Sequence, residues 1–409
     1  MRSFEENLRL YAQLTVQEGV GLERGQELII SAEVDQTQFV RLVAQEAYKA
    51  GAKNVEVFWK DSELMRTRFI EASDEAIAYA PNWLYDGITR AHKENAARLS
   101  IASADPQMLA GISPNRVATF SNVQSKASKE TSEIISGFVI NWCVVGAASA
   151  GWAKRVFPEL PEAEAVAKLW EKIFLSSRVL EEDPIAAWTA HSETLEAKVT
   201  WLNELNFETL HFTGPGTDLY VGLVEGHEWA GGRGYAKNGI QCSPNIPTEE
   251  VFTMPHRARV DGIVSSTKPL SLRGQMVDKI KVEFKNGAVV SASAEVGNDA
   301  LQKLIATDDG AKRLGEVALV PNSCKVAQTG ILFLNTLYDE NAACHIALGR
   351  SYSENLRGID DLSEEERLER GSNDSLIHVD WMIGSGEVNV DGIKFDGTKV
   401  PLMRSGEWV

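Results

Sequence analysis

The sequence of 409 residues contains only four cysteines, and no two of them form a CxxC pair. Cys143, Cys242, Cys324 and Cys344 are far apart, each among apolar or small residues. This spacing argues against a disulfide framework and against a cysteine-based zinc site. We therefore expect four buried free thiols. A thiolate ligand at Cys344, beside His345, is the less favoured alternative.

Long apolar runs and an excess of positive charge are also missing. No apolar run reaches the roughly 18 residues that a membrane-spanning helix needs. The opening MRSFEENLRLYAQL has acids and no apolar segment of the kind found in secretory signals, so we expect a cytoplasmic protein without a membrane partner. With 41 basic and 58 acidic residues the net charge is −17, which disfavours nucleic-acid binding. Such a charge suits a metal or a substrate ammonium group, although solubility alone also explains it.

The first half alternates predicted strands and helices but lacks a phosphate-binding loop. No GxGxxG or GxxxxGK[ST] follows a strand there, so a Rossmann cofactor site has little support. The alternation predicts a parallel or mostly parallel α/β sheet. The predicted strands are 27–34, 54–59, 98–104 and 137–145, and the predicted helices are 4–16, 36–50, 114–135, 160–175 and 184–205, the last broken near Trp188.

After residue 210 glycines become frequent, strands are short and helices are few. Asn286-Gly287 is a strong hairpin signal between two alternating segments. The second half is therefore predicted to be α+β and largely antiparallel, and to bear any metal site. We predict an α/β N-terminal domain over residues 1–195 and a catalytic domain over residues 196–409. The strands predicted in this half are 210–214, 218–223, 257–265, 280–284, 288–296 and 316–320.

The segment IHVDWMIGS contains the most informative pair of polar residues. If this apolar run is a strand, His378 and Asp380 are two residues apart and share one face. Imidazole and carboxylate are the ligand types of Zn, Co and Mn sites, and two ligands on one rigid strand make a preorganised site. A hydrogen-bonded pair with a purely structural role is the alternative.

Three further motifs supply carboxylates, a histidine and a tyrosine. Glu249 and Glu250 lie in a short extended piece between prolines, and only one of them can face a given cavity. Glu316 stands at the mouth of an apolar strand, and Glu340, His345 and Tyr352 follow within a short window. Each motif alone also fits a surface carboxylate or a histidine bonded to backbone. Together they supply enough ligands for two divalent ions.

These motifs resemble the metallo-aminopeptidases of the aminopeptidase T, AmpS and PepS group. The matching stretches are NIPTEEVFTMP, LGEVALV, NTLYDENAACHIALGRSY and IHVDWMIGS, and the resemblance covers essentially the whole chain. It implies a two-domain homodimer that releases N-terminal residues from peptides, with two divalent metal ions (Zn, Co or Mn) as cofactors. It also implies six metal ligands, Glu316 bridging: Glu250, Glu316, Glu340, His345, His378 and Asp380.

By the resemblance, Tyr352 looks like a tyrosine that either orients the ligands or stabilises the oxyanion. The chemistry also needs a general base, and a glutamate not fully used as a ligand can serve. Glu249 is our candidate for that base, and Glu316 counts as catalytic because it holds both metals. Two other hypotheses compete: a two-metal hydrolase of another bond, such as a phosphoester, and a metal-stabilised binding protein without turnover. The first lacks a basic phosphate clamp, and closed structural zinc sites are usually rich in cysteine.

Overall fold

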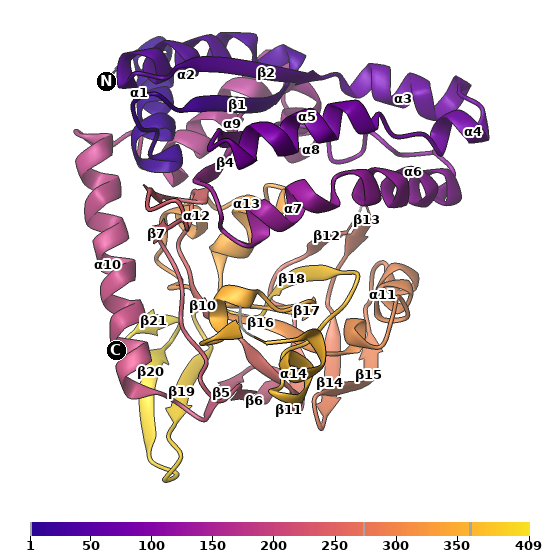
Figure 1. The fold of residues 1–409 in the computed structure, drawn as a ribbon. Helices are drawn as coiled ribbons and strands as arrows, with labels where there is room; N and C mark the ends of the chain where they lie inside the picture. The colour runs from indigo at the N-terminus through magenta and orange to yellow at the C-terminus, as the bar shows by residue number, and fades with distance from the viewer. Residues whose placement is uncertain (1, 273–274, 360–361) are drawn as a thin grey trace. The chain divides into compact units, whose positions relative to one another are not determined.

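The computed structural model describes residues 2–272, 275–359 and 362–409 (Figure 1). They form two compact units, each treated by itself below. The first unit comprises the chain up to Ala190 together with Arg233–Pro247. The second comprises His191–Gly232 together with Thr248–Val409. The functional division into domains 1–195 and 196–409 stays a prediction.

The first unit alternates strands and helices along the chain. Its strands are β1 (Glu27–Glu33), β2 (Asn54–Lys60), β3 (Ala97–Ala102), β4 (Trp142–Gly146), β7 (Gly234–Tyr235), β8 (Gln241–Cys242) and β9 (Asn245–Ile246). Its helices are α1 (Phe4–Leu14), η1 (Thr15–Val20), η2 (Val34–Gln36), α2 (Thr37–Ala50), α3 (Ser62–Glu71), α4 (Asp74–Ile77), α5 (Asn82–Lys93), α6 (Pro114–Ala127), α7 (Lys129–Ser136), α8 (Ala150–Val156) and α9 (Glu162–Ser176). Helix α10 (Pro184–Leu205) begins here and ends in the second unit.

Five strands of this unit form a parallel sheet in the order β2-β1-β3-β4-β9. The chain passes from β2 over β1 to β3, and right-handed crossovers therefore put α2 and α5 on opposite faces (Figure 1). On one face Phe39 of α2 stacks on Tyr11 of α1 at 5.0 Å and meets Trp170 of α9 at 6.0 Å. On the other, Thr89 of α5 hydrogen-bonds Thr131 of α7. The predicted α/β first half is confirmed.

The second unit is mostly strand. Its strands are β5 (Thr209–Gly214), β6 (Thr217–Leu223), β10 (Val251–Thr253), β11 (Pro255–Ser265), β12 (Leu270–Leu272), β13 (Gln275–Val277), β14 (Lys281–Lys285), β15 (Ala288–Ser293), β16 (Leu314–Leu319), β17 (His345–Gly349), β18 (His378–Met382), β19 (Asn389–Ile393), β20 (Lys399–Arg404) and β21 (Glu407–Trp408). Its helices after α10 are α11 (Asn298–Ile305), η3 (Gly310–Lys312), α12 (Lys325–Gln328), α13 (Thr336–Asp339), η4 (Glu340–Ala342), η5 (Ser353–Asn355) and α14 (Glu364–Glu369).

Two antiparallel sheets dominate this unit. One has four strands in the order β10-β16-β17-β18, and the other has eight in the order β15-β14-β11-β6-β5-β19-β20-β21. Side chains from both sheets meet in one apolar core, in which Val317, Ile346 and Trp381 join Phe212 and Val260. The predicted antiparallel second half is confirmed, and so is the hairpin at Asn286-Gly287, between β14 and β15.

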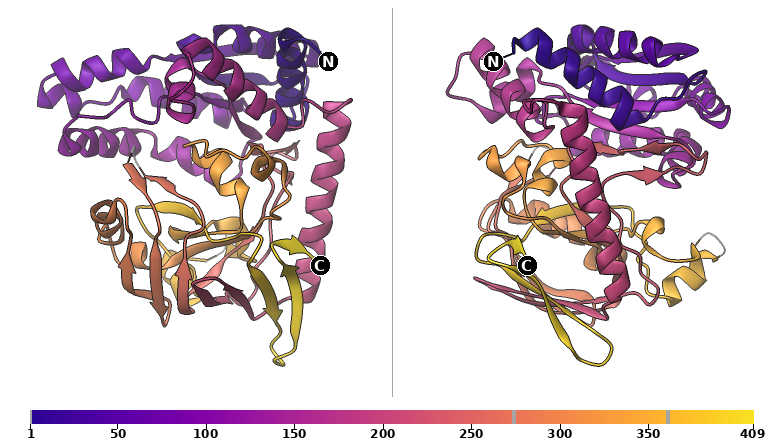
Figure 2. Two further views of the ribbon diagram at one scale, coloured as in Figure 1. Left: turned by 180° about the vertical axis from the view of Figure 1, so that it is seen from behind. Right: turned by 90° about the vertical axis from the view of Figure 1, so that its left-hand side faces the viewer.

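Two expectations about local structure were wrong, and one connection was not foreseen. Helix α10 is continuous through Trp188, which is fully buried, rather than broken there (Figure 2). Residues 137–141 precede β4 instead of belonging to it. The chain from Arg233 returns to the first unit, where β9 adds an edge strand to the parallel sheet, a connection that no sequence pattern announced.

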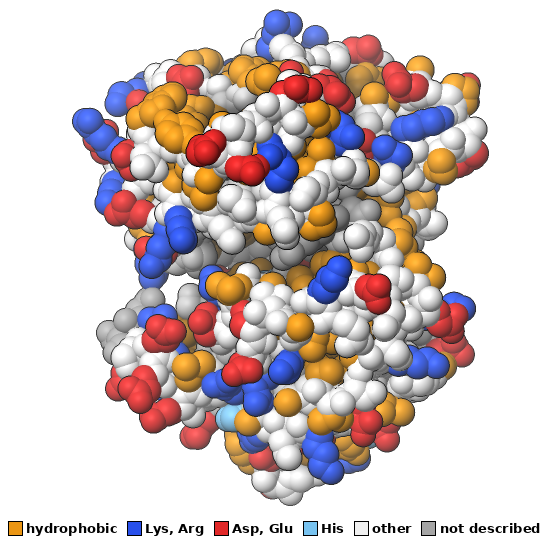
Figure 3. Space-filling model, turned by 90° about the vertical axis from the view of Figure 1, so that its right-hand side faces the viewer, with side chains coloured by type: hydrophobic (Ala, Val, Ile, Leu, Met, Phe, Trp, Pro, Cys, Tyr) orange, Lys and Arg blue, Asp and Glu red, His pale blue; other side chains and the backbone are white. Residues whose placement is uncertain are grey.

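The four thiols and the surface agree with the composition. Cys143, Cys242, Cys324 and Cys344 are buried and free, as predicted. On the face drawn in Figure 3, acidic and basic side chains are interspersed rather than gathered by sign. Over the ranges that the structure describes, no helix has both the length and the apolar character needed to cross a membrane.

Candidate metal centre

The register of the four-stranded sheet brings polar residues from separate motifs onto one face. Glu316 on β16 lies opposite Ala347 on β17, and Ala347 lies opposite Asp380 on β18. Ala318 lies opposite His345 in the neighbouring row. Directly opposed residues in antiparallel strands share a face. The two alanines therefore leave room above the sheet between the longer polar side chains.

The opposite face of the same sheet explains why these strands are so apolar. Val317, Ile346 and Trp381 alternate with the polar residues and point into the core of the second unit. Every residue of β16 and β17 is buried. The sequence run LGEVAL thus has a glutamate in a fully buried strand, and burying such a charge is costly unless a partner compensates it.

The sequence predicted a strand that carries His378 and Asp380, and both residues lie in strand β18. His378 lies opposite Gly349, at the end of β17. The backbone of Gly349 has φ +112°, and a Cβ atom there would lie 2.1 Å from the carbonyl oxygen of Ile377. A glycine is therefore required for β18 to approach β17 at the point where His378 enters the site.

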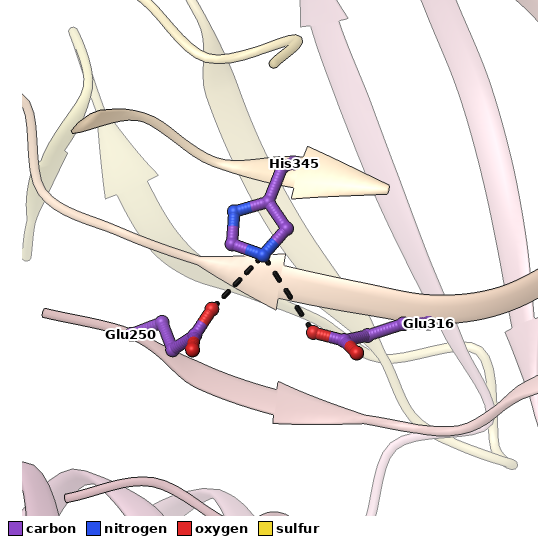
Figure 4. A group of neighbouring side chains, drawn as sticks. All are labelled: Glu250, Glu316 and His345. Atoms are coloured by element: carbon purple, nitrogen blue, oxygen red, sulfur yellow. Dashed lines mark ion pairs between the residues drawn. The ribbon is translucent and has the colours of Figure 1, made fainter. Parts of the chain in front are cut away.

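The first group of potential ligand atoms belongs to Glu250, Glu316 and His345, and these atoms lie within 4.8 Å of one another. His345 Nε2 is 2.9 Å from Glu250 Oε2 and 3.6 Å from Glu316 Oε1 (Figure 4). Glu250 directly precedes β10, and two residues later Phe252 lies opposite Ala318. The glutamate is thus delivered from the edge of the same sheet.

The second group consists of Glu316, His378 and Asp380. His378 Nε2 is 3.3 Å from Glu316 Oε2 and 3.4 Å from Asp380 Oδ2. The two carboxylate oxygens of Glu316 therefore turn toward different histidines, Oε1 toward His345 and Oε2 toward His378. A carboxylate arranged in this way can serve two neighbouring cations.

Both histidines present the nitrogen that a metal would use. His345 Nδ1 lies 3.1 Å from the carbonyl oxygen of Ala343, and His378 Nδ1 lies 2.6 Å from that of Arg350. A backbone carbonyl accepts only from a protonated Nδ1, so the neutral ring keeps its lone pair on Nε2. A carbonyl contact of this kind is the usual orienting partner of metal-binding histidines.

The charges at this face are not balanced by the side chains alone. Burial, and then neighbouring Asp380 and Glu250, raise the pKa of Glu340 well above its ordinary value. Burial likewise raises the pKa of Glu250, against the effect of His345. For both histidines burial would lower the pKa, but the surrounding carboxylates outweigh it and raise the pKa well above the ordinary value. The cluster thus favours added positive charge.

Unpartnered atoms supply the test of whether a cation fits here. His378 Nε2 and Asp380 Oδ1 are buried and have no hydrogen-bond partner among the described residues. The neighbours of His378 Nε2 are carboxylate oxygens of Glu316 and Asp380, at 3.3 and 3.4 Å. A buried polar atom without a partner costs free energy. A divalent ion would satisfy these atoms, and the nitrogen and oxygen donors suit zinc, cobalt or manganese.

Glu340 and Tyr352 lie beside the two groups rather than in them. Glu340 begins η4, and its carboxylate interacts electrostatically with those of Asp380 and Glu250. The Tyr352 ring lies 4.5 Å from that of His378, and 40% of Tyr352 is exposed. Partial burial, and then the charges of Glu316 and Asp380, raise the pKa of Tyr352 well above its ordinary value, so its hydroxyl keeps its proton.

Glu249 points to a different partner from Glu250. Both lie just before β10, and they turn to different sides, as expected for neighbouring residues of an extended segment. The Glu249 carboxylate is buried and lies 3.6 Å from His191 Nε2, which also contacts the carbonyl oxygen of Thr248 at 2.8 Å. In the part of the chain that the structure describes, Glu249 belongs to neither group of potential ligand atoms.

Two nearby residues escaped the sequence reasoning. Although Glu354 is exposed, partial burial and then the charge of Glu316 raise the pKa of its carboxyl to about 7. Asn341 is fully buried, and its Oδ1 accepts a hydrogen bond from the backbone N–H of Glu249 at 2.7 Å. Glu354 follows Tyr352 by two residues and Asn341 is next to Glu340, so proximity to the motifs was the only available signal.

Comparison with known proteins yields matches along the whole chain. The family model described as thermophilic metalloprotease (M29) matches residues 4–408. The chain is 51% identical to aminopeptidase T of Thermus aquaticus over 409 residues and 44% identical to aminopeptidase AmpS of Bacillus subtilis over 408 residues, covering 100% of each chain. The solved structure of wild-type AmpT from Thermus thermophilus matches with a TM-score of 0.95 at 49% identity, covering 100% of both chains. The chain therefore belongs to the thermophilic metalloprotease (M29) family, which confirms the family and the class of peptide-bond hydrolase that its sequence predicts.

Proposed function

We propose that this protein is a metal-dependent aminopeptidase that removes the N-terminal residue from peptides. The observation that carries the proposal is the shared carboxylate of Glu316, whose two oxygens face two separate groups of nitrogen and oxygen donors. Relatives named aminopeptidase T and AmpS support the reaction class. The negative net charge also suits a substrate with a free ammonium group.

We assign six residues to two divalent ions, chosen from Zn, Co and Mn. Glu250 and His345 would hold one ion, His378 and Asp380 the other, and Glu316 would bridge them. Glu340 would complete the set, since its buried carboxylate lies in the same field of charges. When bound, a pair of such ions supplies an activated water and polarises the scissile carbonyl.

The remaining roles fall to side chains of the chain itself. Tyr352 keeps its proton and would donate a hydrogen bond to the oxygen of the scissile carbonyl as negative charge develops there. Glu249 is our candidate to accept the proton of the attacking water. Glu354, with a pKa raised to about 7, is the rival for this role, because a general base works best with a pKa near the working pH.

Hydrolysis of amino-acid p-nitroanilides tests the proposal. The chain should release p-nitroaniline with added Co²⁺, Zn²⁺ or Mn²⁺, lose this activity on chelation, and regain it when metal returns. Glu316→Gln should abolish turnover while the far-UV circular dichroism stays unchanged, because it removes the carboxylate common to both groups. Full activity of this variant, or no metal-dependent release across a broad panel of residues, would contradict the proposal.

A phosphate substrate and a metal analysis separate the other two hypotheses from this one. A phosphoesterase would hydrolyse p-nitrophenyl phosphate faster than the anilides. A metal-stabilised binding protein would hold one non-exchangeable ion and turn over neither substrate. The homodimer implied by the resemblance, the cytoplasmic location and the domain limits 1–195 and 196–409 stay predictions.

A further inference from the structure

The first unit contains a cavity of about 730 Å³ whose lining belongs entirely to that unit. Its volume falls in the range of roughly 300–1,000 Å³ found for small-molecule sites. The lining comes from α1, from the segment after β1 with the start of α2, from the segment after β4, and from α9 with Leu180 beyond it. The residues that matter below are Phe4, Asn7, Asp35, Phe39, Trp170 and Glu171.

The cavity occupies a favoured place in a parallel sheet. Asp35 follows the carboxyl end of β1, and Ser149 follows the carboxyl end of β4. The connection that leaves β1 runs to β2 on one side, whereas the connection that leaves β3 runs to β4 on the other, so the strand order reverses beside β1. Ligands of open α/β sheets bind outside the carboxyl ends of the strands near such a reversal.

The walls are aromatic. Trp170 lies 5.9 Å from the ring of Phe4 and 6.0 Å from that of Phe39, measured between centroids. The faces of aromatic rings attract cations as well as apolar groups. These walls favour a ligand with an apolar body, and they are compatible with a positive charge.

The charges of the lining are all negative. It includes Asp35 and Glu171 and no Lys, Arg or His. Glu171 is already paired, at 3.3 Å from Lys168 Nζ and 3.9 Å from Lys172 Nζ. Within the described ranges Asp35 makes no ion pair, and its side chain accepts one hydrogen bond, from Gln36 Nε2 at 3.1 Å. Asp35 is exposed, and partial burial raises the pKa of its carboxyl.

Two other polar groups of the lining are not available to a ligand. Asn7 Oδ1 is shielded from solvent, and the Gln36 amide donates to Asp35 and to the carbonyl oxygen of Ala148. The Asp35 carboxylate is therefore the acceptor on which a ligand with hydrogen-bond donors would depend.

We propose that this cavity binds a hydrophobic primary amine. The ammonium group is held by the Asp35 carboxylate, and the apolar body lies against Phe39 and Trp170. A free amino acid is disfavoured because its carboxylate would meet a lining that has acids but no cation. The inference is independent of the aminopeptidase proposal, since no residue of the candidate metal centre takes part.

Calorimetric titration of the full chain with 2-phenylethylamine tests this site. Saturable binding is expected, and Asp35→Asn should weaken it by at least about ten-fold, the effect of losing one charged hydrogen bond. Glu171→Gln is the matched control and should change the affinity by less than about two-fold, because its charge is neutralised by lysines. The neutral 2-phenylethanol should bind at least about ten-fold more weakly than the amine, and 3-phenylpropionate should not bind.

Three results would overturn the proposal. One is the absence of saturable amine binding up to about 10 mM, a range that includes weak specific sites. Another is an unchanged affinity in a folded Asp35→Asn variant, which would put the amine elsewhere, such as among the carboxylates of the metal centre. The third is equal binding of amine and alcohol to the unaltered chain. This last comparison decides the matter even if Asp35→Asn does not fold.

Discussion

Asn341 ties together the segments that carry Glu250 and Glu340. Its Oδ1 accepts a hydrogen bond from the N–H of Glu249 at 2.7 Å, and its Nδ2 donates to the carbonyl oxygen of Leu337 at 3.2 Å. Glu249 directly precedes Glu250, and Asn341 directly follows Glu340. One fully buried amide therefore fixes two proposed ligands that are 90 residues apart in the sequence.

Asn341→Ala is expected to weaken metal binding by about 10- to 100-fold, as losses of groups that orient ligands typically do. The measurement is the metal dissociation constant by calorimetry. Asn203→Ala is the control, because Asn203 makes similar contacts with the backbone of Trp229, at 2.9 and 3.3 Å, without touching a ligand segment. Equal affinities of the Asn341 variant and the unaltered chain would remove the positioning role.

Metal removal is expected to lower the thermal stability as well as the activity. Without a cation, the carboxylates of Glu250, Glu316, Glu340 and Asp380 are left buried beside one another. A metal at about 100 times its dissociation constant should stabilise the fold by about 2.7 kcal/mol. Melting curves with chelator and with added Co²⁺ or Zn²⁺ measure this. In Glu316→Gln the metal should give a much smaller shift; an equal shift there would mean that the ion binds elsewhere.

Tyr352→Phe is expected to lower kcat by about 10²–10³-fold and leave KM nearly unchanged, because a single donor to the developing oxyanion acts in the transition state. The ring contact with His378 survives the substitution, so metal affinity should not change. Steady-state kinetics and metal calorimetry on one preparation separate the two effects. A loss of metal affinity equal to the loss of rate would make Tyr352 a structural residue.

The two candidate bases can be told apart by paired variants. If Glu249 accepts the proton, Glu249→Gln should lower kcat by about 10²–10⁴-fold, while Glu354→Gln should retain most activity. The opposite pattern would assign the role to Glu354. The pH–rate profiles provide a second measurement, because only loss of the true base should remove the acid limb. Two fully active variants would exclude both residues.

Asp308 makes a pH-dependent contribution to stability close to the site. Its carboxylate accepts hydrogen bonds from Ser375 Oγ at 2.8 Å, Leu376 N at 2.7 Å and Ala311 N at 2.8 Å, just before β18 begins. Burial would raise the pKa of Asp308, but these bonds outweigh it and lower the pKa. The contribution is therefore complete above about pH 4, the ordinary pKa of the unfolded carboxyl, and is lost as the pH falls through the lower folded value.

Asp308→Asn should accordingly destabilise the fold by about 2 kcal/mol at pH 7, with the difference shrinking below about pH 4. Urea unfolding at several pH values measures it. The neighbouring, exposed Asp309→Asn is the control and should stay within about 0.5 kcal/mol of the unaltered chain. A pH-independent difference for the Asp308 variant would show that packing, rather than charge, is responsible.

Local sequence patterns predicted the positions of strands better than they predicted which strands pair with one another. The apolar run around His378 and Asp380 predicted strand β18, and the apolar run after Glu316 predicted β16, which begins two residues earlier, at Leu314. The row that puts Glu316, Ala347 and Asp380 side by side depends on pairing between distant strands, which no local period encodes. The candidate residues could therefore be predicted from the sequence, but the strand pairing that brings them together could not.

The failures have similar causes. Strand β9 has only two residues, Asn245 and Ile246, so it is too short for a recognisable alternation, and its place depends on a partner strand in the first unit. Helix α10 continues through Trp188, where a break was predicted, because that side chain is fully buried in the first unit instead of marking a loop. Neighbouring glutamates 249 and 250 turn to His191 and His345 respectively, a choice set by tertiary contacts.

The row of Glu316, Ala347 and Asp380 also bears on how the protein matures. A nascent chain that contains only β10 and β16 has an incomplete set of proposed ligands, because β17 and β18 are synthesised later. A slip of β18 by a single position would turn His378 and Asp380 into the apolar core. Tight metal binding is therefore expected late in folding, and the metal content of a preparation should measure the fraction of molecules in which β16, β17 and β18 have paired correctly.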